Sequence, residues 1–193
     1  QMRILATDGT FIFDRSVGGS AEGVLRVGGV DGWRPFLAVT LPDSVPVEGS
    51  DELFSLQRAS INKAELYLVS LNGPDPPFAA DQLFFTTTYQ LAGDFTVLGA
   101  KTPVSNIVFG SDVSIDPDSL QAGDLVTIDV TFLVQRWVEQ LDGSTASPVR
   151  LSIRALPEAT TFGYWDFGAA DGDPQFRPTL RIVFTPPTEF LLP

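Results

Sequence analysis

Short runs of alternating apolar and polar residues constrain the fold of this chain more than any other feature. Between residues 61 and 70, Ala64, Leu66 and Leu68 alternate with charged or polar neighbours. Successive side chains of a strand point to opposite faces, so strict alternation indicates a strand with one buried face. The pattern recurs in three later segments, at residues 126–130, 151–155 and 180–184.

Turn-forming residues separate these runs along the whole chain. The 17 Gly and 15 Pro are spread through the sequence, often beside Asp or Asn, as in Asn72-Gly73-Pro74. Many short strands divided by such turns are typical of a sandwich or barrel. The sequence therefore predicts an all-β fold, an antiparallel jelly-roll-like β-sandwich. At 193 residues, we expect one domain covering residues 1–193.

One segment departs from the period of two. From residue 130 the apolar residues follow a helical stripe instead of an alternation. The stripe consists of Val130, Leu133, Val134, Trp137 and Leu141. We therefore expect one short helix near residues 130–141, capped by Asp129 or Thr131. The alternative is a strand that continues through Val134.

The composition excludes several classes of function. The chain has no Cys and no His, which excludes disulfides, Cys/His zinc sites and Ser-His-Asp triads. Its 12 basic and 24 acidic residues give a net charge of −12, which argues against nucleic acid as a partner. No apolar run is long enough for a membrane-spanning helix. We expect that the protein is not an enzyme, because general acid–base catalysis would depend on carboxylates alone.

Several segments together resemble a known family. They are residues 6–11, Leu25-Arg-Val-Gly28, residues 34–41, residues 61–68, the strand-plus-helix block at 126–137 and the closing strand at 177–184, which begins Arg-Pro-Thr-Leu. In this order they resemble the DNRLRE-type domain, also classed as carbohydrate-binding module family 96, a β-sandwich related to the disaggregatase repeats. The resemblance implies a secreted module that either binds polysaccharide or serves a structural role at the cell surface.

Loop carboxylates provide candidate calcium ligands. Calcium takes six to eight oxygen ligands, and sandwich loops often supply them. The candidates fall into two sets, Asp112, Asp116 and Asp118, or Asp171 and Asp173. The alternative is that these residues form solvated turns. We expect no required cofactor, and calcium only in a structural role.

Aromatic residues provide the candidate carbohydrate platform. Sugars stack their C–H faces on flat rings that have polar groups beside them. The candidates are Trp33, Tyr164 and Trp165. Tyr164 and Trp165 are adjacent, so on a strand one ring would point inward and the other outward. We expect Trp137 to belong to the core.

The two ends of the chain are unusually apolar. Residues 1–6 place Met2, Ile4 and Ala6 on one face, and residues 188–193 contain Phe190, Leu191 and Leu192. An extended terminal segment can complete the sheet of a neighbouring molecule, which generates open filaments. The leading expectation is thus a non-catalytic, extracellular protein that forms a homo-oligomer or homopolymer at the cell surface or in a filament. The alternative is a carbohydrate-binding module that recognises a polysaccharide.

Overall fold

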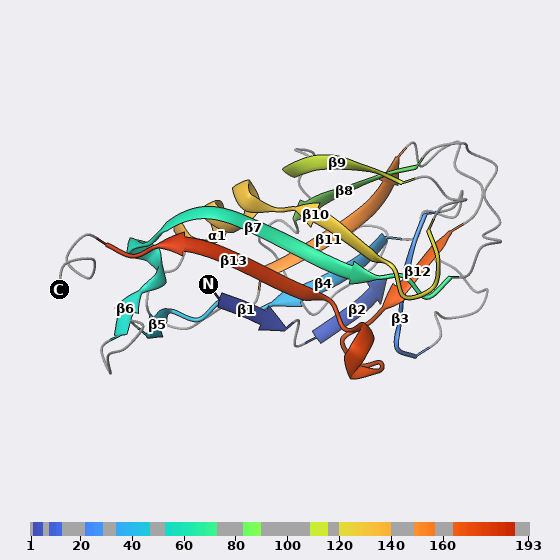
Figure 1. Cartoon of the computed structure of the whole chain (residues 1–193), viewed down its shortest axis with the longest axis horizontal. Coiled ribbons are helices and arrows are strands. Elements are labelled where there is room, and N and C mark those ends of the chain that lie inside the picture. The colour runs from blue at the N-terminus through green and yellow to red at the C-terminus, as the bar shows by residue number, and fades with distance from the viewer. Residues whose placement is uncertain are drawn as a thin grey trace.

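The computed structural model has two layers of strands and, among the residues it describes, one α-helix that lies beside the strand β7 (Figure 1). It describes residues 2–5, 8–12, 22–28, 34–46, 53–72, 83–89, 109–115, 120–139, 149–156 and 164–187. All the strand pairs in this part of the chain are antiparallel. The predicted all-β fold is confirmed, whereas the jelly-roll arrangement and the single domain stay predictions.

The first sheet contains four strands in the order β1-β13-β7-β10. They are β1 (Met2–Leu5), β13 (Thr179–Thr185), β7 (Ser60–Val69) and β10 (Leu125–Asp129). The longest strand, β7, lies in the middle, and β1 and β10 form the two edges.

The second sheet contains five strands in the order β2-β4-β11-β8-β9. They are β2 (Asp8–Ile12), β4 (Arg34–Val39), β11 (Val149–Leu156), β8 (Leu83–Tyr89) and β9 (Phe109–Ile115). Two small ribbons complete the strands, β3 (Val24–Val27) with β12 (Trp165–Gly168), and β5 (Ser44–Pro46) with β6 (Leu53–Ser55). Single 3₁₀ turns, η1 (Leu56–Arg58) and η2 (Pro174–Phe176), precede β7 and β13.

The core lies between the two large sheets, where the alternation predicted it. On β7, Ala64, Leu66 and Leu68 are at most 1% exposed. Leu180 and Ile182 of β13 and Leu37, Leu151 and Ile153 of the second sheet join the same buried cluster. Burial of these side chains supplies the main stabilisation of a chain that has no disulfide.

The helix α1 (Thr131–Glu139) confirms the change of period, and the alternative strand through Val134 is wrong. Val130, Leu133, Val134 and Trp137 are buried, while Leu141 lies outside the described residues. Within the described part of the chain, no helix is long and apolar enough to cross a membrane.

Hydrogen bonds to β7 explain why the chain turns from β10 into α1. The Val130 amide still donates to the Ala64 carbonyl at 2.9 Å, as in a sheet. At the next position the Thr131 hydroxyl accepts from the Ala64 amide at 2.9 Å, so a side chain replaces the ladder carbonyl. Asp129 Oδ1 accepts from the Thr131 amide at 2.8 Å. Both predicted capping residues therefore contribute to the start of the helix.

Candidate functional site

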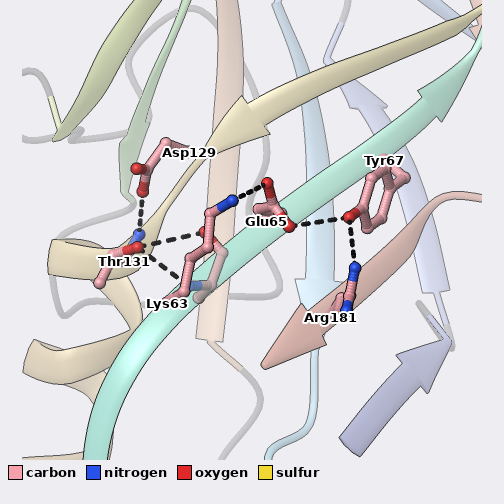
Figure 2. A network of polar contacts seen from close by, with 7 residues as sticks. Lys63, Glu65, Tyr67, Asp129, Thr131 and Arg181 are labelled. Carbon is pink, nitrogen blue, oxygen red and sulfur yellow. Dashed lines mark hydrogen bonds and ion pairs between the residues drawn. The ribbon is translucent and has the colours of Figure 1, made fainter. Parts of the chain in front are cut away.

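The outward-facing surface of the first sheet carries the candidate site; we call it the outer face. On β7, alternation places Lys63, Glu65 and Tyr67 on this face, opposite the buried leucines. Arg181 of β13 stands beside Glu65 in the sheet register, and Asp129 of β10 stands on the other side of Glu65. Figure 2 shows these polar side chains gathered over the middle of the sheet.

A chain of polar contacts links Lys63, Glu65, Tyr67 and Arg181. Lys63 Nζ lies 2.6 Å from Glu65 Oε1, and the Tyr67 hydroxyl donates to Glu65 Oε2 at 2.8 Å. Arg181 Nη1 donates to the Tyr67 hydroxyl oxygen at 3.4 Å. The Glu65 side chain is only 14% exposed, whereas that of Lys63 is 55% exposed. Glu65 is therefore the covered centre of the network, and Lys63 is its solvent-facing partner.

This arrangement shifts the ionisation of the central pair. The hydrogen bonds from Lys63 and then Tyr67 hold the pKa of Glu65 below its usual range, against the opposing effect of burial. The same contact raises the pKa of Lys63. Both groups are therefore charged at neutral pH.

A groove of about 440 Å³ lies on the outer face next to this network. Its floor includes Tyr67 of β7 and Arg181 of β13, and Gln175 and Arg177 line it from the segment that leads into β13. Leu125, at the start of β10, is 57% exposed and adds an apolar wall. The groove thus combines a phenol ring, two guanidinium groups, an amide and a hydroxyl with the apolar side chains of Val69, Leu125 and Pro174.

Local hydrogen bonds at the start of η2 fix the segment that carries Gln175 and Arg177 to the groove. Asp173 Oδ1 accepts from the Gln175 amide at 3.0 Å, and Pro174 occupies the first turn of η2. Asp173 Oδ2 also accepts from the Gln175 side chain, at 3.3 Å. Arg177 Nε donates to the Gly172 carbonyl at 3.4 Å. These contacts hold Gln175 and Arg177 at the groove.

The groove suits a polar ligand with several hydroxyl or carbonyl oxygens. Arginine and glutamine donate hydrogen bonds to such oxygens, and a tyrosine ring offers a flat surface to C–H groups. In the part of the chain that the structure describes, these side chains come from segments more than a hundred residues apart, at Tyr67 and at residues 175–181. Pairing of β13 with β7 brings them together.

The predicted aromatic platform requires a correction. Trp165 is completely buried, and its Nε1 donates to Ser70 Oγ at 2.7 Å, so its ring cannot stack on a sugar. Tyr164 is half-buried, with the Arg26 guanidinium 3.5 Å from its ring centre. One ring therefore points into the core, as predicted. Trp33 lies outside the described residues, and Trp137 is 3% exposed, which confirms it as a core residue.

Arg26 also forms an ion pair that joins the two strands of the β3–β12 ribbon. Its Nε and Nη2 bind the two carboxylate oxygens of Asp166 at 2.7 and 2.8 Å, across the pair of β3 with β12. This bidentate contact raises the pKa of Arg26. The Arg26 guanidinium covers one face of the Tyr164 ring, so that face packs within the protein and is not open to a ligand.

Of the candidate calcium ligands, only Asp171 and Asp173 have side chains that the structure describes. Both oxygens of Asp173 accept hydrogen bonds from Gln175, and Asp171 is exposed. Asp112 lies in β9, of which the structure describes the backbone, and Asp116 and Asp118 lie outside the described residues. Among the residues described, no three carboxylates form a group that could hold a metal ion. Structural calcium stays a prediction.

Two of the candidate assembly residues, Met2 and Ile4, lie in an edge strand of the first sheet. β1 pairs with β13 of its own chain, with Met2 opposite Ile182 and Ile4 opposite Leu180. Ala6 and the residues Phe190, Leu191 and Leu192 lie outside the described residues. The amino-terminal segment is therefore a strand of the sandwich, and its use between molecules stays a prediction.

Sequence reasoning missed the groove. Alternation alone places Tyr67 and Arg181 on outward faces, but only the register of β13 against β7 shows that they are neighbours. Gln175 and Arg177 follow a turn, where no sequence periodicity indicates which way a side chain points.

No protein-family model matches the sequence, and no curated protein matches it at a significant level. The resemblance to the DNRLRE-type domain therefore stays a prediction.

Proposed function

We propose that this chain is a non-catalytic, extracellular structural protein that assembles with copies of itself at a cell surface or in a filament. The observation that carries the proposal is the position of β1. This four-residue terminal strand forms one edge of the first sheet, and among the described strands it has a neighbour, β13, on one side only. Edge strands present unpaired backbone groups, which are a template for pairing with another chain.

The composition agrees with assembly of this kind. Edge pairing requires neither a metal nor a cysteine, and the chain has no Cys and no His. Main-chain hydrogen bonds provide the affinity in strand addition, and alternate side chains provide the specificity. An interface between unlike edges does not close on itself, so it produces filaments.

The experiment compares the full chain with a variant that lacks residues 1–6. Both proteins are concentrated and imaged by negative-stain electron microscopy, after circular dichroism has shown that each is folded. We expect polymers from the full chain and none from the shortened chain. A variant that lacks residues 188–193 is the matched control for the other end. A full chain that stays monomeric at every concentration would contradict the proposal.

A second function, recognition of a polysaccharide, is supported by the groove on the outer face. The groove offers the Tyr67 ring with Gln175, Arg177 and Arg181 around it, a combination suited to sugar hydroxyls and ring C–H groups. The net charge of −12 disfavours anionic polysaccharides in general, although the groove itself carries two arginines.

A glycan array with the purified protein tests this second function. Saturable binding that is lost in Tyr67→Ala and Arg177→Ala would support it. The matched control is Arg136→Ala, which removes an exposed arginine of α1. Binding that survives in the groove variants, or is lost equally in the control, would exclude the groove as the site.

A further inference from the structure

The groove on the outer face has a cationic side and an apolar side. Arg177, Thr179 and Arg181 are alternate residues of the chain, and all three line the groove along β13 and the residues before it. On the other side Val69 of β7 pairs with Leu125 of β10, and both line the groove. None of the lining residues is acidic, although acidic residues outnumber basic ones 24 to 12 in the chain. The groove therefore favours a partner that has a carboxylate beside apolar side chains.

Arg177 carries the charge that such a partner can meet. Among the described contacts, its guanidinium donates one hydrogen bond, from Nε to the Gly172 carbonyl at 3.4 Å. No ion pair joins it to a carboxylate in the described part of the chain. A guanidinium has five N–H donors, so the two Nη groups can still bind a carboxylate. The side chain is half-buried, which reduces screening of its charge by solvent.

The residues after Pro187 have the composition that the groove favours. They lie outside the described residues, and their sequence is Thr-Glu-Phe-Leu-Leu-Pro at 188–193. Glu189 is the charged residue of this segment, and three apolar residues follow it directly. The segment therefore offers a carboxylate beside apolar side chains.

We propose that the groove of one copy binds residues 188–193 of another copy, with the Glu189 carboxylate on Arg177 and Leu191 over Val69 and Leu125. This inference rests on the proposed self-assembly and gives the groove a partner within it. Alternate side chains of an extended segment share a side, and Glu189 and Leu191 are then about 7 Å apart. The two strand spacings from β13 to β10 amount to about 10 Å, a difference that the long arginine side chain bridges.

A molecule cannot place this segment in its own groove. The groove lies where β13 begins, and β13 ends at Thr185, at the far end of the sheet (Figure 1). The seven residues of β13 span roughly 20 Å. The two prolines that follow favour an extended chain, which carries it further from the groove. Glu189 comes only about 7 Å of chain after them, so it can reach Arg177 only in another molecule.

The contact joins molecules end to end. The groove and the start of the 188–193 segment lie at opposite ends of β13, so each copy offers a groove at one end and a segment at the other. A contact between unlike surfaces of this kind repeats without closing. It adds copies along the strands, whereas pairing at the β1 edge adds them across the strands. The two contacts are therefore independent and can be tested separately.

Titration calorimetry of the full chain with a synthetic peptide tests the contact. The peptide has the sequence of residues 186–193, acetylated at its amino end and amidated at its carboxyl end, so that Glu189 carries its only charge. The protein is kept below the concentration at which it assembles. We expect saturable binding at one site per molecule, weakened about fivefold by Arg177→Ala and by Leu125→Ala.

A double-mutant cycle separates the ion pair from general effects of charge. A peptide with Glu189→Gln should bind the wild-type chain about fivefold more weakly, with no further loss in Arg177→Ala, because both changes remove the same contact. Arg136→Ala, which removes an exposed arginine of α1, is the matched control and should bind the peptide as the wild type does. Thermal unfolding of each variant shows that it is folded, and Leu125 is 57% exposed, so its replacement leaves the core intact.

The outcomes distinguish this inference from the proposed function. A peptide that does not bind, or that binds Arg177→Ala and Leu125→Ala as well as the wild type, would overturn the contact and leave self-assembly at the β1 edge standing. A polysaccharide that occupies the groove and is not displaced by the peptide would also overturn it. A wild-type chain that stays monomeric at every concentration would refute the proposed function itself, whatever the peptide does.

Discussion

At the scale of single residues, we expect substitution of two buried serines to affect stability differently. Ser70 Oγ accepts the Trp165 indole hydrogen at 2.7 Å, whereas Ser152 Oγ is buried without a hydrogen-bond partner among the described residues. Ser70→Ala removes the acceptor of this buried hydrogen bond, so we expect a loss of about 1–3 kcal/mol in the free energy of unfolding.

Ser152→Ala is the matched control, because it removes a hydroxyl that forms no such bond. We expect its free energy of unfolding to change by about 0.5 kcal/mol or less, or to rise. Urea unfolding of both variants measures the difference. A Ser152→Ala variant that loses as much as Ser70→Ala would contradict the assignment.

At the same scale, we expect the contribution of Glu65 to the stability of the fold to depend on pH. Its pKa is lowered in the folded protein, so its ionised form stabilises the fold above the ordinary value of 4.5, and this contribution is lost as the pH falls through the lowered pKa. Wild type should therefore exceed Glu65→Gln in melting temperature at pH 7, with a gap that narrows in strong acid.

The cause of that gap can be tested separately. Lys63 makes the largest contribution to lowering the pKa of Glu65. In a Lys63→Gln background, the effect of Glu65→Gln on melting temperature should thus change less with pH. A gap between wild type and Glu65→Gln that is the same at every pH would show that Glu65 acts only through packing.

At the scale of elements, the junction of β10 with α1 depends on Thr131. Thr131→Val keeps the shape but removes the oxygen that accepts from the amide of the buried Ala64. We expect a loss of about 1–3 kcal/mol in the free energy of unfolding, measured by urea denaturation. Thr127→Val, on the outward face of β10, is the control and should change it by about 0.5 kcal/mol or less. Equal losses would contradict the role of the hydroxyl.

The elements also show what the sequence can predict. The alternation at Ala64, Leu66 and Leu68 identified a buried face, and the stripe ending at Trp137 identified the helix, because both depend on local periodicity. The orientation of Trp165 and the groove beside Tyr67 depend on which strands are neighbours. Such pairings join segments far apart in the chain, and no local pattern specifies them.

At the scale of the whole molecule, the net charge of −12 opposes the assembly of like copies. Salt screens repulsion between distant surface charges more completely than it affects strand pairing and apolar contact. A single exposed ion pair contributes at most about 1 kcal/mol. We therefore expect added salt to strengthen assembly overall.

Sedimentation velocity of the wild-type chain over a range of concentrations, at low and at physiological salt, tests self-assembly most directly. We predict species that grow with concentration and that form at lower concentration in the higher salt. A single monomeric species under every condition would contradict the account.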